Sequence, residues 1–153
     1  LYGATSGKLF AAGLAGDRFA VRNSGAITVV EGCDSNGCEY MTGGTVIILG
    51  DVGDNFAAGM TGGMAFIYDK SRKFEKKVNP ETVIWQNVET KYWIDFLKKM
   101  VLEHSKETDS VLSKNIFTNF DDEIKNFVQV CPKEMLDKLS NPISLKPVIK
   151  EVS

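Results

Sequence analysis

The sequence predicts a mainly β protein, a right-handed single-stranded β-helix, with a helical extension on its C-terminal side. All fourteen glycines lie between Gly3 and Gly63. Four of these glycines, at positions 7, 25, 44 and 63, are separated by 18, 19 and 19 residues. A fixed period in this range is typical of solenoid repeats. All four prolines follow residue 79, which indicates that the chain consists of two unlike parts.

Each repeat has apolar residues at alternating positions after its leading glycine. The second position holds Leu9, Ile27, Val46 and Ala65, and the fourth holds Ala11, Val29, Ile48 and Ile67. Successive side chains of a β-strand point to opposite faces of the sheet. We therefore expect both positions to point into the solenoid.

The glycines suit the corners of the coils, because a residue without Cβ reaches positive φ without a clash. We expect a second short strand in each coil, over residues 18–23, 39–42 and 56–61. One coil cannot bury its own apolar face, so the coils must stack on one another. A β-sandwich of short hairpins is the alternative, but hairpin sheets seldom keep such a constant period.

The predicted organisation has three segments. Residues 1–69 form the coils, and residues 70–140 form a linker and a helical extension. Residues 141–153 form an extended or disordered tail. The chain begins inside the repeat, with Leu1 rather than Met, so we expect the coils to be truncated at the N-terminal side of a longer protein.

The second part contains one strongly amphipathic helix, predicted over residues 91–107 and capped by Thr90. Its apolar face consists of Trp93, Phe96, Leu97, Met100, Val101 and His104. This spacing corresponds to one side of an α-helix. Asp109 is predicted to cap a second helix, residues 127–130 to form a strand, and residues 135–139 to form a last helical turn.

Charge and composition exclude several classes of function. Residues 1–69 carry three basic and seven acidic side chains, and residues 70–153 carry fifteen and thirteen, so neither part is basic enough to predict nucleic-acid binding. No apolar run is long enough to span a membrane. Three cysteines, an odd number, argue against a disulfide framework, so we expect a cytoplasmic protein.

The sequence offers only weak candidates for a chemical site. Cys33 and Cys38 could form a metal or redox pair, but a zinc or iron–sulfur site usually needs four ligands. Only Cys131 and His104 remain to complete such a set, and both lie far along the chain. We interpret both thiols as packing around a coil corner, and His104 as a packed residue of the helix face. Residues 3–9 imitate a phosphate-binding loop, but Leu9 replaces the required Ser or Thr.

Two further groups of side chains have a structural interpretation. The acidic stretch from Asn119 to Glu123 is interpreted as a helix cap with a solvated turn. The aromatic residues Trp85, Tyr92, Trp93 and Phe96 are interpreted as packing rather than as a ligand-binding patch. The residues alone therefore predict a scaffold with a docking element, and no catalytic, cofactor-binding or metal-binding residue.

Several glycine-rich runs closely resemble a known family. They are residues 1–26, 30–33, 37–46 and 53–66, together with residues 78–81 and 119–122 of the second part. Over about residues 1–135 the chain resembles the C-terminal domain of the glutamate synthase large (alpha) subunit, which is described by its Gly-x-Gly-x-Gly repeats. The resemblance implies a right-handed β-helix.

The resemblance also implies the role of the intact protein, which makes two glutamates from glutamine and 2-oxoglutarate. FMN and a 3Fe–4S cluster are implied for other domains, and none of their ligands matches a residue of this chain. Reductant would come from a small NAD(P)H-oxidising subunit or from ferredoxin. The β-helix would buttress the amidotransferase and FMN domains of the same chain. The family positions matched by Cys33 and Cys38 are not cluster ligands.

Two alternatives to this assignment stay open from the sequence. The chain could be a stand-alone β-helix interaction module, since an aromatic face has no assigned partner. It could also belong to a subunit of another redox complex, of the formylmethanofuran dehydrogenase type. The helical part with residues 119–122 favours the glutamate synthase large chain over both.

Overall fold

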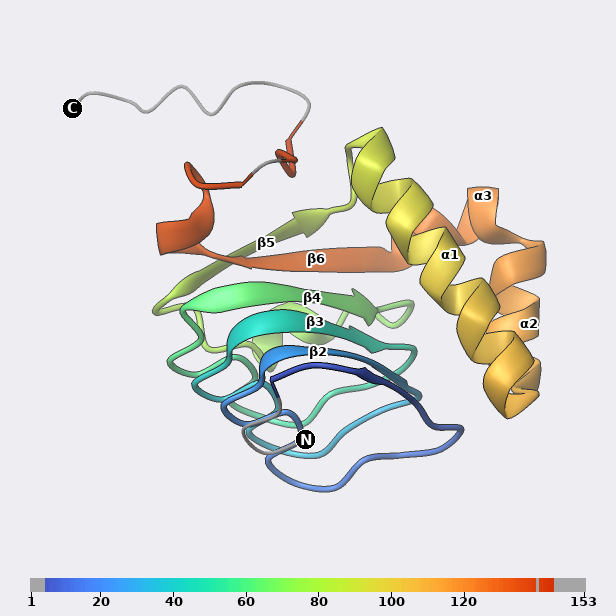
Figure 1. Cartoon of the computed structure of the whole chain (residues 1–153), viewed down its shortest axis with the longest axis horizontal. Helices are drawn as coiled ribbons and strands as arrows, with labels where there is room; N and C mark the ends of the chain where they lie inside the picture. Colours follow the sequence, from blue (N-terminus) through green and yellow to red (C-terminus); the bar gives the residue numbers. More distant parts are fainter. Residues whose placement is uncertain (1–4, 140, 145–153) are drawn as a thin grey trace.

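The computed structural model describes residues 5–139 and 141–144. Six strands form one mixed sheet in the order β1-β2-β3-β4-β6-β5. The first four are parallel and belong to successive coils of a β-solenoid (Figure 1): β1 Lys8–Phe10, β2 Ser24–Val30, β3 Thr42–Ile48 and β4 Gly62–Tyr68. The predicted fold class, a mainly β solenoid with a helical extension, is confirmed.

The pairing of the strands gives the length of each coil. Lys8 pairs with Ile27, Ile27 with Thr45, and Thr45 with Met64. The coils are therefore 19, 18 and 19 residues long, whereas the glycines predict 18, 19 and 19. The difference arises in the second coil, where Ala26 rather than Gly25 corresponds to Gly44.

This shift changes which residues of β2 point inward. The strand residues that fill the solenoid include Val30, Val46, Ile48, Ala65 and Ile67. The predicted inward positions are therefore right for β3 and β4. They are wrong for Ile27 and Val29, because Thr28 pairs with inward-facing Val46 and takes the interior position.

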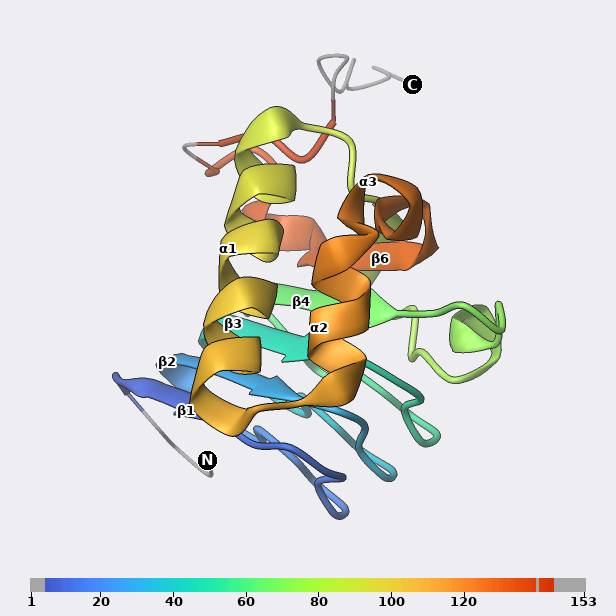
Figure 2. The ribbon, with the colours of Figure 1, turned by 90° about the vertical axis from the view of Figure 1, so that its right-hand side faces the viewer.

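The outer face of the sheet is buried beneath helices, as Figure 2 shows for α1 and α2 in front of β2–β4. The helices are α1 Lys91–Thr108, α2 Val111–Thr118 and α3 Phe120–Glu123. Sheet residues Val29, Ile47 and Phe66 form one apolar cluster with Leu97, Met100 and Val101 of α1. Because both faces of the sheet are covered, β3 and β4 end in continuous apolar runs, residues 46–48 and 64–68.

The predicted second strand of each coil is wrong. Residues 17–22 and 35–40 are turns, and residues 54–59 consist of a bend, an isolated bridge at Phe56 and a turn. In these segments alternate residues have φ between 53° and 65°: Arg18, Ala20, Arg22, Asn36, Cys38, Tyr40, Asn55, Ala57 and Gly59. Left-handed backbone is costly for residues other than glycine. Hydrogen bonds between coils offset this cost, as in the bond from Cys38 N to Phe19 O at 2.7 Å.

Two antiparallel strands end the parallel stack. β6 Phe127–Pro132 pairs with β4, and β5 Val83–Asn87 pairs with the other edge of β6. The strand predicted at residues 127–130 is confirmed and is two residues longer, whereas the sequence did not predict β5. Three short 3-10 helices lie between these elements: η1 Phe74–Lys76, η2 Ile124–Asn126 and η3 Lys133–Met135.

The helix ends differ from the prediction at both predicted caps. Thr90 lies at the N-cap of α1, but its side chain makes no capping hydrogen bond. α1 ends at Thr108, one residue beyond the predicted end, and Asp109 follows it with φ of 54°. Ser110 caps α2 instead, because its hydroxyl accepts a hydrogen bond from Ser113 N at 3.1 Å. Asp109 takes the left-handed conformation, which its short polar side chain tolerates, so it does not cap the second helix.

Candidate functional site

A groove of about 480 Å³ lies beside the carboxyl ends of β2, β3 and β4. Parallel strands all end on the same side of a sheet, so the residues that follow them gather there. Glu31 follows β2, Asp51 lies three residues beyond β3, and Tyr68 ends β4. Lys70 and Lys73 line the same groove. We call this feature the carboxyl-end groove.

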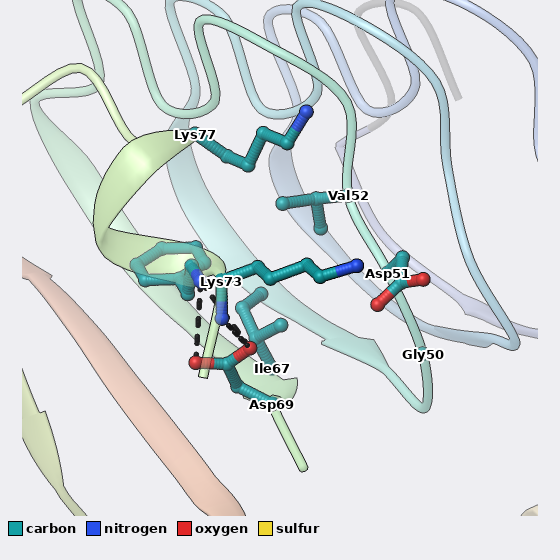
Figure 3. A pocket seen from close by; sticks show the side chains of 8 residues that line it. Gly50, Asp51, Val52, Ile67, Asp69, Lys73 and Lys77 are labelled. Carbon is teal, nitrogen blue, oxygen red and sulfur yellow. Dashed lines mark hydrogen bonds between the residues drawn. The ribbon is translucent and has the colours of Figure 1, made fainter. Parts of the chain in front are cut away.

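A smaller hollow of about 160 Å³ adjoins this groove and shares Asp51 and Lys73 with it (Figure 3). The Asp69 carboxylate in this hollow accepts hydrogen bonds from Lys73 N at 3.0 Å and Phe74 N at 3.2 Å. The Lys73 ammonium points toward the Asp51 carboxylate (Figure 3). Asp69 therefore holds the start of η1, which is a structural role.

A hydrogen-bonded pair joins the groove to α3. The Tyr68 hydroxyl donates to the Glu123 carboxylate, which also accepts a bond from Asn126 Nδ2 at 3.3 Å. Burial and the neighbouring Glu123 raise the pKa of Tyr68, so the phenol remains a neutral donor. The acidic stretch 119–123 forms the short helix α3, with exposed Asp121 and Asp122 in its first turn. Asn119 lies between α2 and α3: its Nδ2 atom donates to Asn115 O at 3.1 Å at the end of α2, whereas its side chain makes no capping bond to α3.

His104 lies fully buried between α1 and the solenoid, as the helix periodicity predicts. Its Nε2 is 3.5 Å from Glu31 Oε2, and its ring centre is 6.2 Å from that of Phe10. Removal from water lowers the pKa of His104, although the Glu31 carboxylate acts in the opposite direction. The imidazole is therefore a neutral packed group at pH 7.

The cysteines are free thiols inside the protein. Cys33 and Cys38 both belong to the apolar cluster that fills the solenoid. Burial raises the pKa of Cys33 to about 12 and raises that of Cys38 well above its ordinary value. A thiol that does not ionise near neutral pH is a poor metal ligand and nucleophile. Among the described residues, no group of three or more His, Cys, Asp or Glu is placed to hold a metal ion.

The aromatic residues pack as predicted, with one exception. Trp93 and Phe96 of α1 lie against Phe66 of β4, with ring centres 5.8 and 6.2 Å apart. Trp85 packs against Phe74, on the solenoid interior. Tyr92 is half-exposed and its ring meets the edge of Trp93. No helix of the described chain is both long and apolar enough to cross a membrane.

The sequence did not predict the carboxyl-end groove, because its residues come from four successive coils, the loop after β4 and α2. One feature of the sequence nevertheless pointed to this end of the sheet. An acidic residue follows each of three parallel strands, at Glu31, Asp51 and Asp69, spaced by about one coil. Residues one coil apart in a solenoid become neighbours in space.

Stacked coils with glycine at their corners and a helical layer over the sheet define a repeat domain of the solenoid class. The chain belongs to the GXGXG motif family, whose model matches residues 1–133.

The similar proteins are much longer than this chain. It is 57% identical over 149 residues to the glutamate synthase [NADPH] large chain of Azospirillum brasilense, covering 97% of this chain and 10% of that protein. It is 46% identical over 152 residues to glutamate synthase [NADH] of Schizosaccharomyces pombe, covering 99% and 7%. The ferredoxin-dependent glutamate synthase of Spinacia oleracea is 48% identical over 132 residues, covering 86% and 8%. The chain thus spans about a tenth or less of these relatives.

Proposed function

We propose that this chain is the scaffold region of a cytoplasmic glutamate synthase large chain, which converts glutamine and 2-oxoglutarate to two glutamates with the help of a reductant. The observation that carries the proposal is the identity of 46–57% with glutamate synthases over nearly the whole chain. In this proposal the solenoid holds the amidotransferase and FMN domains of the same large chain at a constant separation.

The side chains of the candidate site support a structural role. Asp69 caps η1, Glu123 binds Tyr68, and Glu31 lies beside the buried His104. These groups serve the fold rather than projecting together toward one substrate atom, which a catalytic set requires.

The chemistry of the three buried cysteines argues against an iron–sulfur cluster in this part of the protein. A cluster needs ionised cysteine ligands, whereas burial raises the pKa of all three thiols. We therefore propose that both cofactors belong to other domains, and that electrons come from a small NAD(P)H-oxidising subunit or from ferredoxin.

The test compares two kinds of variant in the full-length protein. Asp51→Ala and Lys73→Ala change the carboxyl-end groove and should leave the turnover number for glutamate formation unchanged. Val46→Asp disrupts the solenoid interior, and it should uncouple glutamine hydrolysis from glutamate formation or prevent assembly. Both activities are measured separately, with circular dichroism as the check on folding. Loss of glutamate formation in a folded groove variant would contradict the scaffold role.

A further inference from the structure

Three asparagines form a hydrogen-bonded ladder on an outer corner of the coils. Asn79 Nδ2 donates to Asn55 Oδ1 at 2.9 Å, and Asn55 Nδ2 donates to Asn36 Oδ1 at 2.9 Å. Asn36 and Asn55 occupy equivalent left-handed positions, with φ of 63° and 59°. Asparagine tolerates this conformation better than most residues.

The direction of the ladder is determined at its Asn79 end. The Asn79 Oδ1 atom accepts a hydrogen bond from Glu81 N at 3.1 Å, so the amide nitrogen must face Asn55. Each following amide then has the same orientation. The last carbonyl, on Asn36, receives a bond, while Asn36 Nδ2 has no partner among residues 5–139 and 141–144.

We propose that Asn36 is a site of spontaneous deamidation through a cyclic imide formed with Gly37. The Gly37 nitrogen loses its proton and bonds to Asn36 Cγ. The Cγ–Nδ2 bond then breaks, and ammonia leaves with the transferred proton. Water opens the ring at either carbonyl and produces aspartate or isoaspartate at position 36. No oxidation or reduction is involved.

The structure provides the nucleophile and the activated carbonyl for this reaction. Within the described chain the Gly37 nitrogen makes no hydrogen bond, so it is not held away from reaction by a partner. Asn55 Nδ2 donates to the Asn36 oxygen, on which negative charge develops during attack. A donor aimed at such an oxygen stabilises the transition state.

The other asparagines of the coil corners lack these features. Phe56 N, which follows Asn55, donates to Lys77 O at 2.9 Å. Asn79 precedes Pro80, which has no N–H. Asn23 precedes the small residue Ser24, but it is fully buried and both of its side-chain polar atoms are bonded to Ala26. Asn23 is therefore the matched control.

The reaction would weaken the stack at this corner. Isoaspartate inserts a methylene group into the backbone, next to the bond from Asn36 N to Asp54 O at 2.9 Å. Either product also adds a negative charge near the exposed Asp54. We therefore expect the modified protein to melt at a lower temperature.

The experiment incubates the native full-length protein at mildly alkaline pH and then maps its peptides. Cleavage after glutamate releases residues 32–39, in which Asn36 is the single asparagine, separately from the peptides that hold Asn23 and Asn55. The peptide 32–39 should gain one mass unit and react in an isoaspartate assay. We expect conversion of Asn36 to exceed that of Asn23 by at least about tenfold. Favourable orientation can increase the rates of intramolecular reactions by much larger factors.

Two controls keep the proposal open to contradiction. The Asn36→Gln variant should release less ammonia at alkaline pH than the native protein, by up to one equivalent. The denatured protein supplies the reference rate of the unconstrained sequence. An unmodified Asn36 in the native protein, under conditions that convert it in the denatured protein, would overturn the proposal. Equal conversion of Asn23 and Asn36 in the native protein would overturn it as well.

Discussion

His104 is the buried titratable side chain that joins α1 to the solenoid. It is fully buried, and its Nε2 atom lies 3.5 Å from the Glu31 carboxylate of the second coil. Burial lowers its pKa below the ordinary value of 6.5, so the folded protein binds a proton there less readily than the unfolded chain. The contribution of His104 to stability is therefore present above pH 6.5 and is lost as the pH falls below this value through the folded pKa.

We therefore expect part of the unfolding free energy to depend on mildly acidic pH, and one substitution should remove this dependence. The His104→Gln variant should lose the part of the pH dependence that lies just below pH 6.5. Urea denaturation at a series of pH values, for both proteins, measures the slope of the unfolding free energy against pH. Equal slopes for both proteins in this window would show that His104 ionises equally in the folded and unfolded states.

Individual interior positions were predictable where the repeat glycine lies in register with the glycine of the neighbouring coil. This holds for Val46 and Ile48, which follow Gly44 and are fully buried. It fails for Val29, because alanine takes the glycine position in the second coil and Gly25 lies one residue too early. A shift of one residue moves a strand side chain to the opposite face of the sheet.

Some glycines of the coils are needed because the neighbouring coil approaches closely, and a pair of variants tests this requirement. A Cβ atom at Gly62 would lie 2.0 Å from Thr42 O of the preceding coil, whereas a Cβ at Gly16 would have no atom within 4 Å. We expect Gly62→Ala to destabilise the protein by about 1–3 kcal/mol, as overpacking does. Gly16→Ala should be neutral within about 0.5 kcal/mol. Thermal unfolding of both variants tests this, and equal losses would contradict the close approach of the coils.

The central strands should not tolerate a charge in the solenoid interior. Val46→Asp or Ile48→Asp places a carboxylate where no solvent reaches, and we expect a loss of more than about 4 kcal/mol, a large part of the stability of a typical domain. Val111→Asp is the control, because Val111 is 71% exposed at the start of α2. An unchanged melting temperature for either interior variant would show that β3 faces the other way.

The elements differ in how much of them the sequence could predict. α1 was predictable because its eighteen residues maintain one apolar face over five turns. The second segment of each coil was not, because alternate left-handed residues are held by hydrogen bonds between coils rather than by local preference. β5 has only five residues, most of them partly exposed, so its pattern is weak.

The complete sheet depends on both halves of the chain, since β6 covers the edge of β4 and α1 covers the outer face. A chain that ends after Asp69 would expose the apolar residues Val29, Ile47 and Phe66 together with an unpaired β4 edge. We expect this truncated chain to aggregate, because open strand edges pair with other chains. Size-exclusion chromatography beside the complete chain measures this, and a monodisperse truncated protein would contradict it. The carboxyl-end groove could not be predicted for a related reason, since its residues meet only after the coils have stacked.

Because the coil length is nearly constant, the length of the solenoid is set by the number of its coils. Each additional coil of 18 or 19 residues moves the two ends apart by one strand spacing, about 4.8 Å. The antiparallel pair β6 and β5 stays in place at one end, so the length can change in uniform steps without redesign of that end. Duplication or deletion of a single coil would therefore change the distance between the two ends of the solenoid by one strand spacing. Any domains attached to these ends would move apart or together by the same step.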